Sequence, residues 1–328
     1  MELGLGIASV AAILAWSRVG FSFGFTDPKI LLIGAGVMIA WYFKTGRDAP
    51  PRLKKAVVLY SICFLASLVF TRDLSISLFG VKGIFSGSLL TAAMCVSGVV
   101  LASKVEKPDV LKKVILCAGA FAAVHGLAQH FGADPFRIGP LPENGAVGMI
   151  GSRIDFGAMM VAMFTVSHNP LYLLGLWSSH SRGAWLGAAV AIIPIKYRVI
   201  GFILASAATM SLTFYSKAPK DILRVEVWKV AVHSATVQGT GPATFLYTFA
   251  ENRSKTVTDL APHYLQAHAH NQILEAVSTR GLLGLLGLLS FLVAPSMTGL
   301  WTIGMFNPIS FEVVFVACVL VGLRRQEE

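Results

Sequence analysis

Long apolar runs, separated by short polar loops, make up most of the 328-residue chain. A helix that spans a lipid bilayer needs about 20 mostly apolar residues. The pattern predicts spanning helices over residues 3–20, 29–43, 54–71, 86–103, 110–131, 198–215 and 281–296. The runs are continuous and do not alternate with a period of two residues, which argues against a transmembrane β-barrel.

Residues 153–196 are apolar but are interrupted twice. The first interruption ends in Asn169-Pro170, where Asn169 or Ser167 is suited to cap a helix and Pro170 suits a first helical turn. The second interruption carries Arg182. We therefore expect three short helices, near residues 153–167, 170–181 and 183–196.

Residues 299–323 form a further apolar region, broken by Asn307-Pro308 into one or two spans. The pattern predicts an all-α polytopic membrane protein with about 11 or 12 transmembrane helices, folded as a single integral membrane domain over residues 1–328. The first run lacks a basic start and a small-residue cleavage site, so we expect a first span and not a cleaved signal peptide.

The composition supports this fold class. The chain is 55% hydrophobic and 13% charged, whereas a soluble domain is about 25% charged. An ordinary soluble enzyme, a disordered chain, a coiled coil and collagen are thereby excluded. The cysteines all lie within apolar runs, which predicts free buried thiols and no disulfide framework: Cys63, Cys95, Cys117 and Cys318.

The net charge of +10 is explained by the loops. Basic residues concentrate at 44–55, 104–113, 196–198 and 324–325, all on one side in the predicted topology. The positive-inside rule makes that side cytoplasmic. Membrane lipids, and no nucleic acid, are therefore the expected partners of the basic residues.

The long polar segment 216–270 falls on the opposite, outer side. It is the one sizeable polar piece of the sequence, and we expect it to hold short amphipathic helices. A long connecting segment in a compact protein is usually functional.

Arg182 lies at the start of an apolar helix, where a charge near membrane depth is costly. One interpretation is an arginine whose head reaches back to the interface. The other is an anion-binding residue, because a guanidinium holds two phosphate oxygens at once.

Arg224 and Trp228 share one face of a predicted amphipathic helix in the outer segment. This pattern is typical either of a surface helix with Trp228 at the membrane interface or of a binding helix. Gly239-Thr-Gly-Pro242 follows, and predicts a tight turn.

His268, His270 and Asn271 precede the next apolar helix. Asn271 is a good N-cap, and the positive end of the helix dipole beside His270 favours anions. His268 and His270 form a His-x-His pair, but no Asp, Glu or Cys completes a metal set at a familiar spacing, so we expect no metal and no cofactor. Histidine suits proton transfer better. Glu275 is either structural or oriented toward a substrate hydroxyl.

Two arginines and a histidine are thus expected to converge on one membrane face. Such a set suits a lipid-linked pyrophosphate, with the arginines on the diphosphate leaving group and the histidine on an acceptor hydroxyl.

The sequence resembles the O-antigen ligase and O-antigen polymerase family over most of its length. The matching motifs are Ser181-Arg182-Gly-Ala, Arg224 to Trp228 with Gly239-Thr-Gly-Pro-Ala-Thr-Phe245, and Ala269-His270-Asn271 through Glu275 to Gly281-Leu-Leu-Gly284. Weaker matches are Asp73 to Gly83, Gly126 to Pro135, and Gly151-Ser-Arg153.

The resemblance implies a multi-pass enzyme of the bacterial inner membrane that moves glycans off undecaprenyl diphosphate at the periplasmic face, with inversion and without metal or nucleotide sugar. It implies that Arg182 and Arg224 bind the diphosphate and that His270 assists the acceptor. Candidates for further substrate contacts are Arg153, His268, Asn271, Glu275 and Trp228.

The acceptor stays open among lipid A core, a growing polysaccharide and a protein side chain. Two other classes also stay open: a secondary transporter or flippase of lipid-linked glycan, and a membrane subunit without catalysis. A transporter predicts ionisable residues deep within the spans, whereas here they crowd one boundary.

Overall fold

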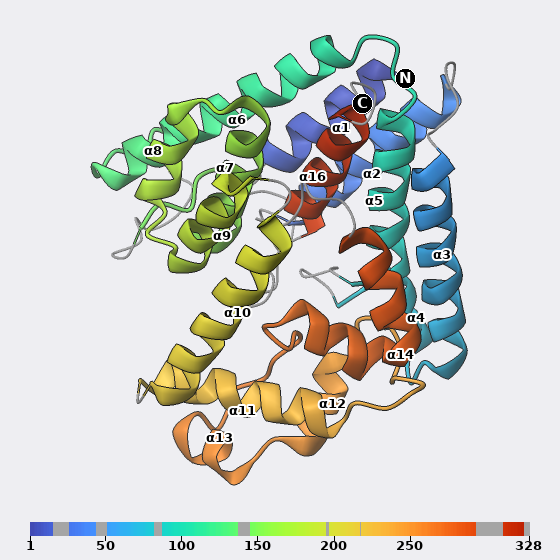
Figure 1. Ribbon diagram of the computed structural model, residues 1–328, viewed down its shortest axis with the longest axis vertical. Helices are drawn as coiled ribbons and strands as arrows, with labels where there is room; N and C mark the ends of the chain where they lie inside the picture. Colours follow the sequence, from blue (N-terminus) through green and yellow to red (C-terminus); the bar gives the residue numbers. More distant parts are fainter. Residues whose placement is uncertain are drawn as a thin grey trace.

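A computed structural model describes residues 1–15, 26–43, 51–81, 87–136, 145–194, 197–216, 218–292 and 311–324. These residues are 76% helical and contain no strand (Figure 1). The helices are α1 (Glu2–Leu14), α2 (Thr26–Tyr42), α3 (Pro51–Ser67), η1 (Leu68–Phe70), α4 (Leu74–Phe79), α5 (Leu89–Ala102), α6 (Pro108–His130), α7 (Arg153–Ser167), α8 (Pro170–Ser178), α9 (Arg182–Ile192), α10 (Arg198–Tyr215), α11 (Pro219–His233), α12 (Phe245–Asn252), α13 (Lys255–Leu260), α14 (Gln272–Leu292) and α16 (Phe311–Arg324). The predicted all-α class is confirmed for this part of the chain.

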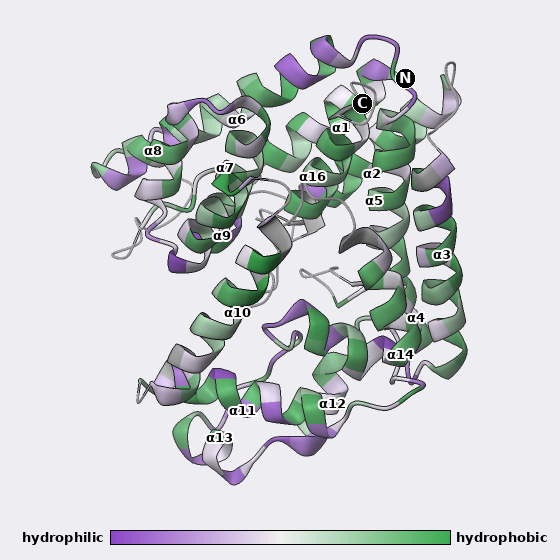
Figure 2. Ribbon diagram, viewed as in Figure 1, coloured by the Kyte–Doolittle hydropathy of each residue, from purple (hydrophilic) through white to green (hydrophobic). Residues whose placement is uncertain are grey.

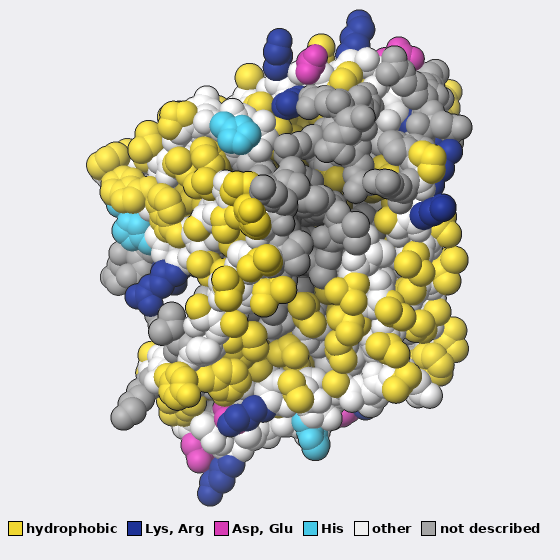
Figure 3. All heavy atoms as spheres, in the orientation of Figure 1, with side chains coloured by type: hydrophobic (Ala, Val, Ile, Leu, Met, Phe, Trp, Pro, Cys, Tyr) yellow, Lys and Arg dark blue, Asp and Glu magenta, His cyan; other side chains and the backbone are white. Residues whose placement is uncertain are grey.

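Three helical stretches within the described ranges are long and apolar enough to cross a membrane: Leu53–Phe70, Pro108–His130 and Gln272–Ser290. Other apolar helices are shorter, at 10–17 residues. Figure 2 colours many helical residues in the middle of the molecule as hydrophobic. On the face shown in Figure 3, apolar side chains cover much of the middle, and most charged side chains lie toward the ends of the long axis. These features are consistent with an α-helical membrane protein. The break at Asn307-Pro308 lies outside the described residues.

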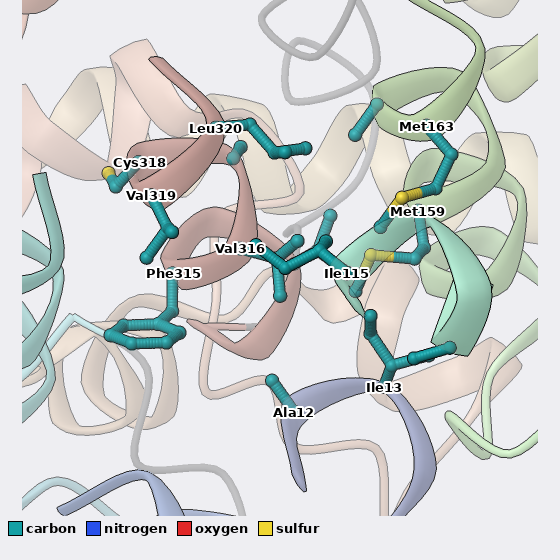
Figure 4. Packing of buried hydrophobic residues seen from close by; sticks show 14 of the residues in the cluster. Ala12, Ile13, Ile115, Met159, Met163, Phe315, Val316, Cys318, Val319 and Leu320 are labelled. Carbon is teal, nitrogen blue, oxygen red and sulfur yellow. The ribbon is translucent and has the colours of Figure 1, made fainter. Parts of the chain in front are cut away.

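The main apolar core joins helices that are distant in sequence. Ile13 of α1, Ile115 of α6, Met159 of α7 and Val316 of α16 point toward one another, and all four are fully buried (Figure 4). Leucine, isoleucine and methionine side chains that interdigitate in this way exclude cavities and fix the relative positions of their helices.

The contact between α1 and α2 depends on small residues. A Cβ atom added at Gly4 or Gly36 would overlap the backbone of the facing helix. Close packing through glycine and alanine is how helices associate where lipid removes the hydrophobic driving force. The two helices therefore meet backbone to backbone.

The two predicted interruptions of residues 153–196 are confirmed. His168 ends α7 in the left-handed conformation (φ 54°), and the Asn169 side chain accepts a hydrogen bond from Leu171 N at 2.9 Å to start α8. Ser181 Oγ accepts one from Ala184 N at 3.4 Å to start α9. Both helices end before the predicted limits, and residues 195–196 lie outside the described part of the chain.

The helix predicted over 281–296 begins earlier, at Gln272, and kinks at Gly281 (φ 65°). Its last predicted residues, 293–296, are not described. The kink forms where the turn predicted at Gly239–Pro242 reaches the helix, because Thr240 N and Gly241 N both donate to Thr279 O, at 2.8 and 2.7 Å. The turn thus binds a carbonyl that the kink leaves free of the helical ladder.

Candidate functional site

Trp228 places α11 against three other helices. Its side chain is 2% exposed and packs against Leu186 of α9, Met210 of α10, and Ile273 and Leu274 of α14. An interfacial tryptophan would expose its ring, so the interpretation of α11 as a helix that lays Trp228 on the membrane surface is wrong. Figure 1 shows α11 at one end of the molecule, with α10 leading to it from α9.

Arg224 lies one helical turn before Trp228, and its side chain is 28% exposed. Its guanidinium is 3.9 Å from Asp221 on the same helix. Burial lowers the pKa of Arg224, and the negative charge of Asp221 opposes that effect. The group is therefore a partly desolvated cation, which binds anions more strongly than a cation in bulk water.

Residues 268–271, hereafter the histidine turn, lead into α14. Asn271 is 1% exposed, and its Oδ1 accepts hydrogen bonds from Ile273 N at 2.9 Å and from Leu274 N at 3.1 Å. The predicted N-cap is thereby confirmed. His270 adopts φ 53°, a left-handed conformation that costs a side-chain-bearing residue on the order of 1–3 kcal/mol. Such strain is kept where the surroundings fix the backbone, which the cap does here.

The two histidines of the turn differ in charge. Burial lowers the pKa of His268, but the charge and the hydrogen bond of Glu275, with Nδ1 and Oε1 2.7 Å apart, outweigh burial and raise that pKa. Burial lowers the pKa of His270 to about 4, helped by the positive charges of Arg224 and His268. His270 is therefore a neutral imidazole at neutral pH, whereas His268 favours the imidazolium.

Among the described residues, three buried nitrogen atoms in this turn and in the neighbouring α11 have no hydrogen-bond partner: Trp228 Nε1, His270 Nδ1 and Asn271 Nδ2. The cap fixes the Asn271 amide, because its oxygen faces the helix and its nitrogen must face away. Trp228 Nε1 and Asn271 Nδ2 can only donate. Buried polar atoms in folded proteins nearly always have partners, so this cluster is suited to a ligand that presents oxygen acceptors.

Arg182 and Arg153 are the first residues of α9 and α7, and both side chains are exposed. Leu186, one helical turn after Arg182, packs against Trp228. Asp155, two residues after Arg153, is close enough to His268 to raise its pKa. The start of α7 therefore lies near the histidine turn, and α9 contacts α11 through Leu186.

Asp155 is a neighbour of the site that the sequence analysis did not identify. Ser152 Oγ accepts a hydrogen bond from Asp155 N at 3.4 Å, and Ser-x-x-Asp is a capping pattern at the start of a helix. That pattern was a signal for the start of α7, although not for its nearness to His268.

Within the described ranges, no group of three or more His, Cys, Asp or Glu side chains is arranged to hold a metal ion. His268 Nδ1 is bound to Glu275, which leaves Nε2 of that imidazole for any other partner. The groups of this region that suit an anion are therefore the Arg224 guanidinium and the buried side-chain donors.

Comparison of the chain with protein-family models, curated proteins and solved structures found no match. The family resemblance therefore stays a prediction from short motifs, and the function has to be argued from the site itself.

Proposed function

We propose that this protein transfers a glycan from undecaprenyl diphosphate to an acceptor hydroxyl at the periplasmic face of the bacterial inner membrane, as a multi-pass protein with 11 or 12 spans. Two features of the described residues support this best. Arg224 lies close enough to the neutral His270 to lower its pKa, and buried nitrogen atoms of Trp228, His270 and Asn271 have no hydrogen-bond partner there. A cation and buried donors suit a diphosphate, and a neutral imidazole suits a hydroxyl.

Arg224 and Arg182 bind the diphosphate of the donor lipid. A planar guanidinium donates to two phosphate oxygens, and its charge offsets the negative charge that builds on the leaving group. Trp228 and Asn271 add hydrogen bonds from the buried side. This role requires no metal ion, since the arginines supply the positive charge.

His270 accepts the proton of the acceptor hydroxyl. The acceptor oxygen then forms a bond to the anomeric carbon while the bond from that carbon to the diphosphate breaks, and undecaprenyl diphosphate leaves. Attack from the face opposite the leaving group inverts the anomeric centre. Because the pKa of His270 is about 4, the imidazolium formed readily gives its proton to water, which returns His270 to the neutral form.

In this proposal Arg153 at the start of α7 and His268 in the histidine turn contact the sugar residues next to the diphosphate. The acceptor is lipid A core, a growing polysaccharide or a protein hydroxyl. Product analysis separates these acceptors.

The test is a transfer assay with purified protein in lipid nanodiscs, given an undecaprenyl-diphosphate glycan and each acceptor class in turn. Mass spectrometry should show an acceptor enlarged by the glycan, with free undecaprenyl diphosphate, and activity should persist in EDTA. Transport of intact donor across a vesicle without product would favour a flippase and overturn the proposal. Loss in EDTA with recovery on Mg²⁺ would reject the metal-free mechanism.

The orientation has its own test. In a variant without native cysteines, Thr256→Cys on exposed α13 should react with an impermeant thiol reagent in spheroplasts, and Lys113→Cys at the start of α6 should not. The reverse pattern would place the site in the cytoplasm.

A further inference from the structure

Glu275 joins the two sides of the histidine turn. Its Oε1 lies 2.7 Å from His268 Nδ1, and its Oε2 accepts a hydrogen bond from Ala269 N at 3.1 Å. One carboxylate on the first turn of α14 therefore holds the two residues that precede His270, while Asn271, the residue that follows it, caps α14.

Glu275 also lies near Gly87. A Cβ atom added at Gly87 would make ordinary van der Waals contacts, at 3.9 Å, with Glu275 Oε1 and with the backbone of Ala243. The Glu275 side chain is 15% exposed. Each of its oxygens already has one partner within the protein, which favours a structural role for Glu275 over one that orients a substrate hydroxyl.

We propose that Glu275 is a positioning residue, which fixes the histidine turn and thereby aims His270 without touching substrate. His270 is held in a left-handed conformation that it would leave if the turn were free. The expected effect of Glu275 on the transfer rate rests on the proposed function. Its effect on the conformation of the histidine turn rests on the contacts alone.

The carboxylate also sets the charge of the turn. Asp155 of α7 acts on His268 and Arg280 of α14 acts on Glu275, while Arg224 of α11, His268 and Glu275 all act on His270. The positive charge of His268, which Glu275 favours, lowers the pKa of His270, whereas the negative charge of Glu275 itself raises it. Position and protonation of His270 thus both depend on one buried carboxylate.

Two substitutions separate these effects. Glu275→Gln keeps an oxygen for Ala269 N but loses the charge, whereas Glu275→Ala loses both contacts. We expect Glu275→Ala to lower kcat by about 10²-fold, the usual result of a displacement near 1 Å, with KM for the donor unchanged. Glu275→Gln should recover part of that loss. Glu251→Gln, on exposed α12, is the matched control and should transfer normally.

A second measurement does not need activity. Diethyl pyrocarbonate modifies neutral imidazole, and peptide mass spectrometry reports the modification of His268 at each pH. In the wild-type protein His268 should react only above the usual histidine range. In Glu275→Gln it should react at lower pH, because the charge that raises its pKa is gone and burial remains.

The outcomes separate the inference from the proposed function. A wild-type protein that transfers nothing, with the His268 shift present in Glu275→Gln, would reject the function and support the link between Glu275 and the turn. Normal kcat and unshifted His268 in Glu275→Gln would overturn the inference. A raised donor KM with normal kcat would overturn it as well, because Glu275 would then bind substrate.

Discussion

The apolar core between α1, α6, α7 and α16 and the histidine turn between α11 and α14 solve the problem of burial in different ways. In the core, Lys29 Nζ, fully buried, donates to Met149 O at 3.2 Å, and Tyr172 OH donates to Leu116 O at 2.7 Å. Within the described ranges, the histidine turn and the adjacent Trp228 hold three buried nitrogen atoms without partners. The other unpartnered buried side-chain atoms there, at Ser9, His125 and Ser206, lie on three different helices.

The difference indicates where the fold has been arranged for stability and where for binding. A packed apolar core is stabilised by every contact it makes. A cluster of unsatisfied donors beside a strained backbone is destabilising by itself, and is kept where a ligand completes it. Substitutions in the first region should change folding, and those in the second should change transfer.

The largest expected effect is in the core. Phe315 of α16 is fully buried against Gly98 of α5. Phe315→Ala should lower the free energy of unfolding by about 3–5 kcal/mol, because it removes the ring and leaves a cavity. Thermal unfolding in detergent measures this, with Phe121→Ala, 46% exposed, as the control. Transfer per folded molecule should stay normal; a selective loss of transfer would break the comparison.

The arginines should show the opposite behaviour. Arg224→Lys and Arg182→Lys should each lower transfer by about 10²–10³-fold, the typical effect of losing one transition-state donor, with little change in unfolding temperature. Arg253→Lys is the matched control. Arg253 is an exposed arginine whose Nη1 donates a hydrogen bond to Pro262 O at 3.0 Å, outside the histidine turn. A fully active lysine variant would reduce that arginine to an interfacial anchor.

Asn271 belongs to both halves of the comparison. Asn271→Ala should destabilise the protein by about 1 kcal/mol through loss of the cap. Asn271→Ser keeps a capping oxygen and loses Nδ2, so it should fold with nearly wild-type stability and still transfer less. Calorimetry and the transfer assay, run on both variants, check this. Normal transfer by Asn271→Ser would remove the amide nitrogen from the site.

The smallest effect is that of pH. The folded pKa of His270, about 4, lies below the ordinary value of about 6.5. The folded state then binds fewer protons than the unfolded state between these values, so His270 lowers stability as pH falls from about 6.5 to about 4. His268, with a raised pKa, acts in the opposite direction. Transfer by the free enzyme should stay level from about pH 6 to 8 and fall below about pH 5. A fall in transfer with a midpoint near pH 6.5 would show that His270 is not desolvated.

The sequence was most informative where structure is local. Pro170 after Asn169, Ser181 before Arg182, and Asn271 before an apolar run each predicted a helix start from residues within one turn, and each start is present. Caps and breaks depend on side chains that bind the neighbouring backbone, so the local sequence contains the information.

Contacts between distant segments were beyond such reasoning. Spacing placed Trp228 and Arg224 on one face of a helix, but did not show that Leu186 and Ile273 bury the indole. The docking of Gly239–Pro242 on Thr279, and thus the kink at Gly281, likewise depends on segments that only the folded chain brings together. Glu275 was left between two roles because its partner, His268, lies outside the helix.

The most direct test compares donor binding and transfer in His270→Ala. We expect this variant to bind the undecaprenyl-diphosphate glycan as well as the wild-type protein does, because the arginines remain. It should transfer the glycan about 10²–10⁴-fold more slowly, which is the usual contribution of a general base. His268→Ala, measured beside it, should lose less. Normal transfer by His270→Ala, or a loss confined to His268→Ala, would contradict the assignment of His270 as the proton acceptor.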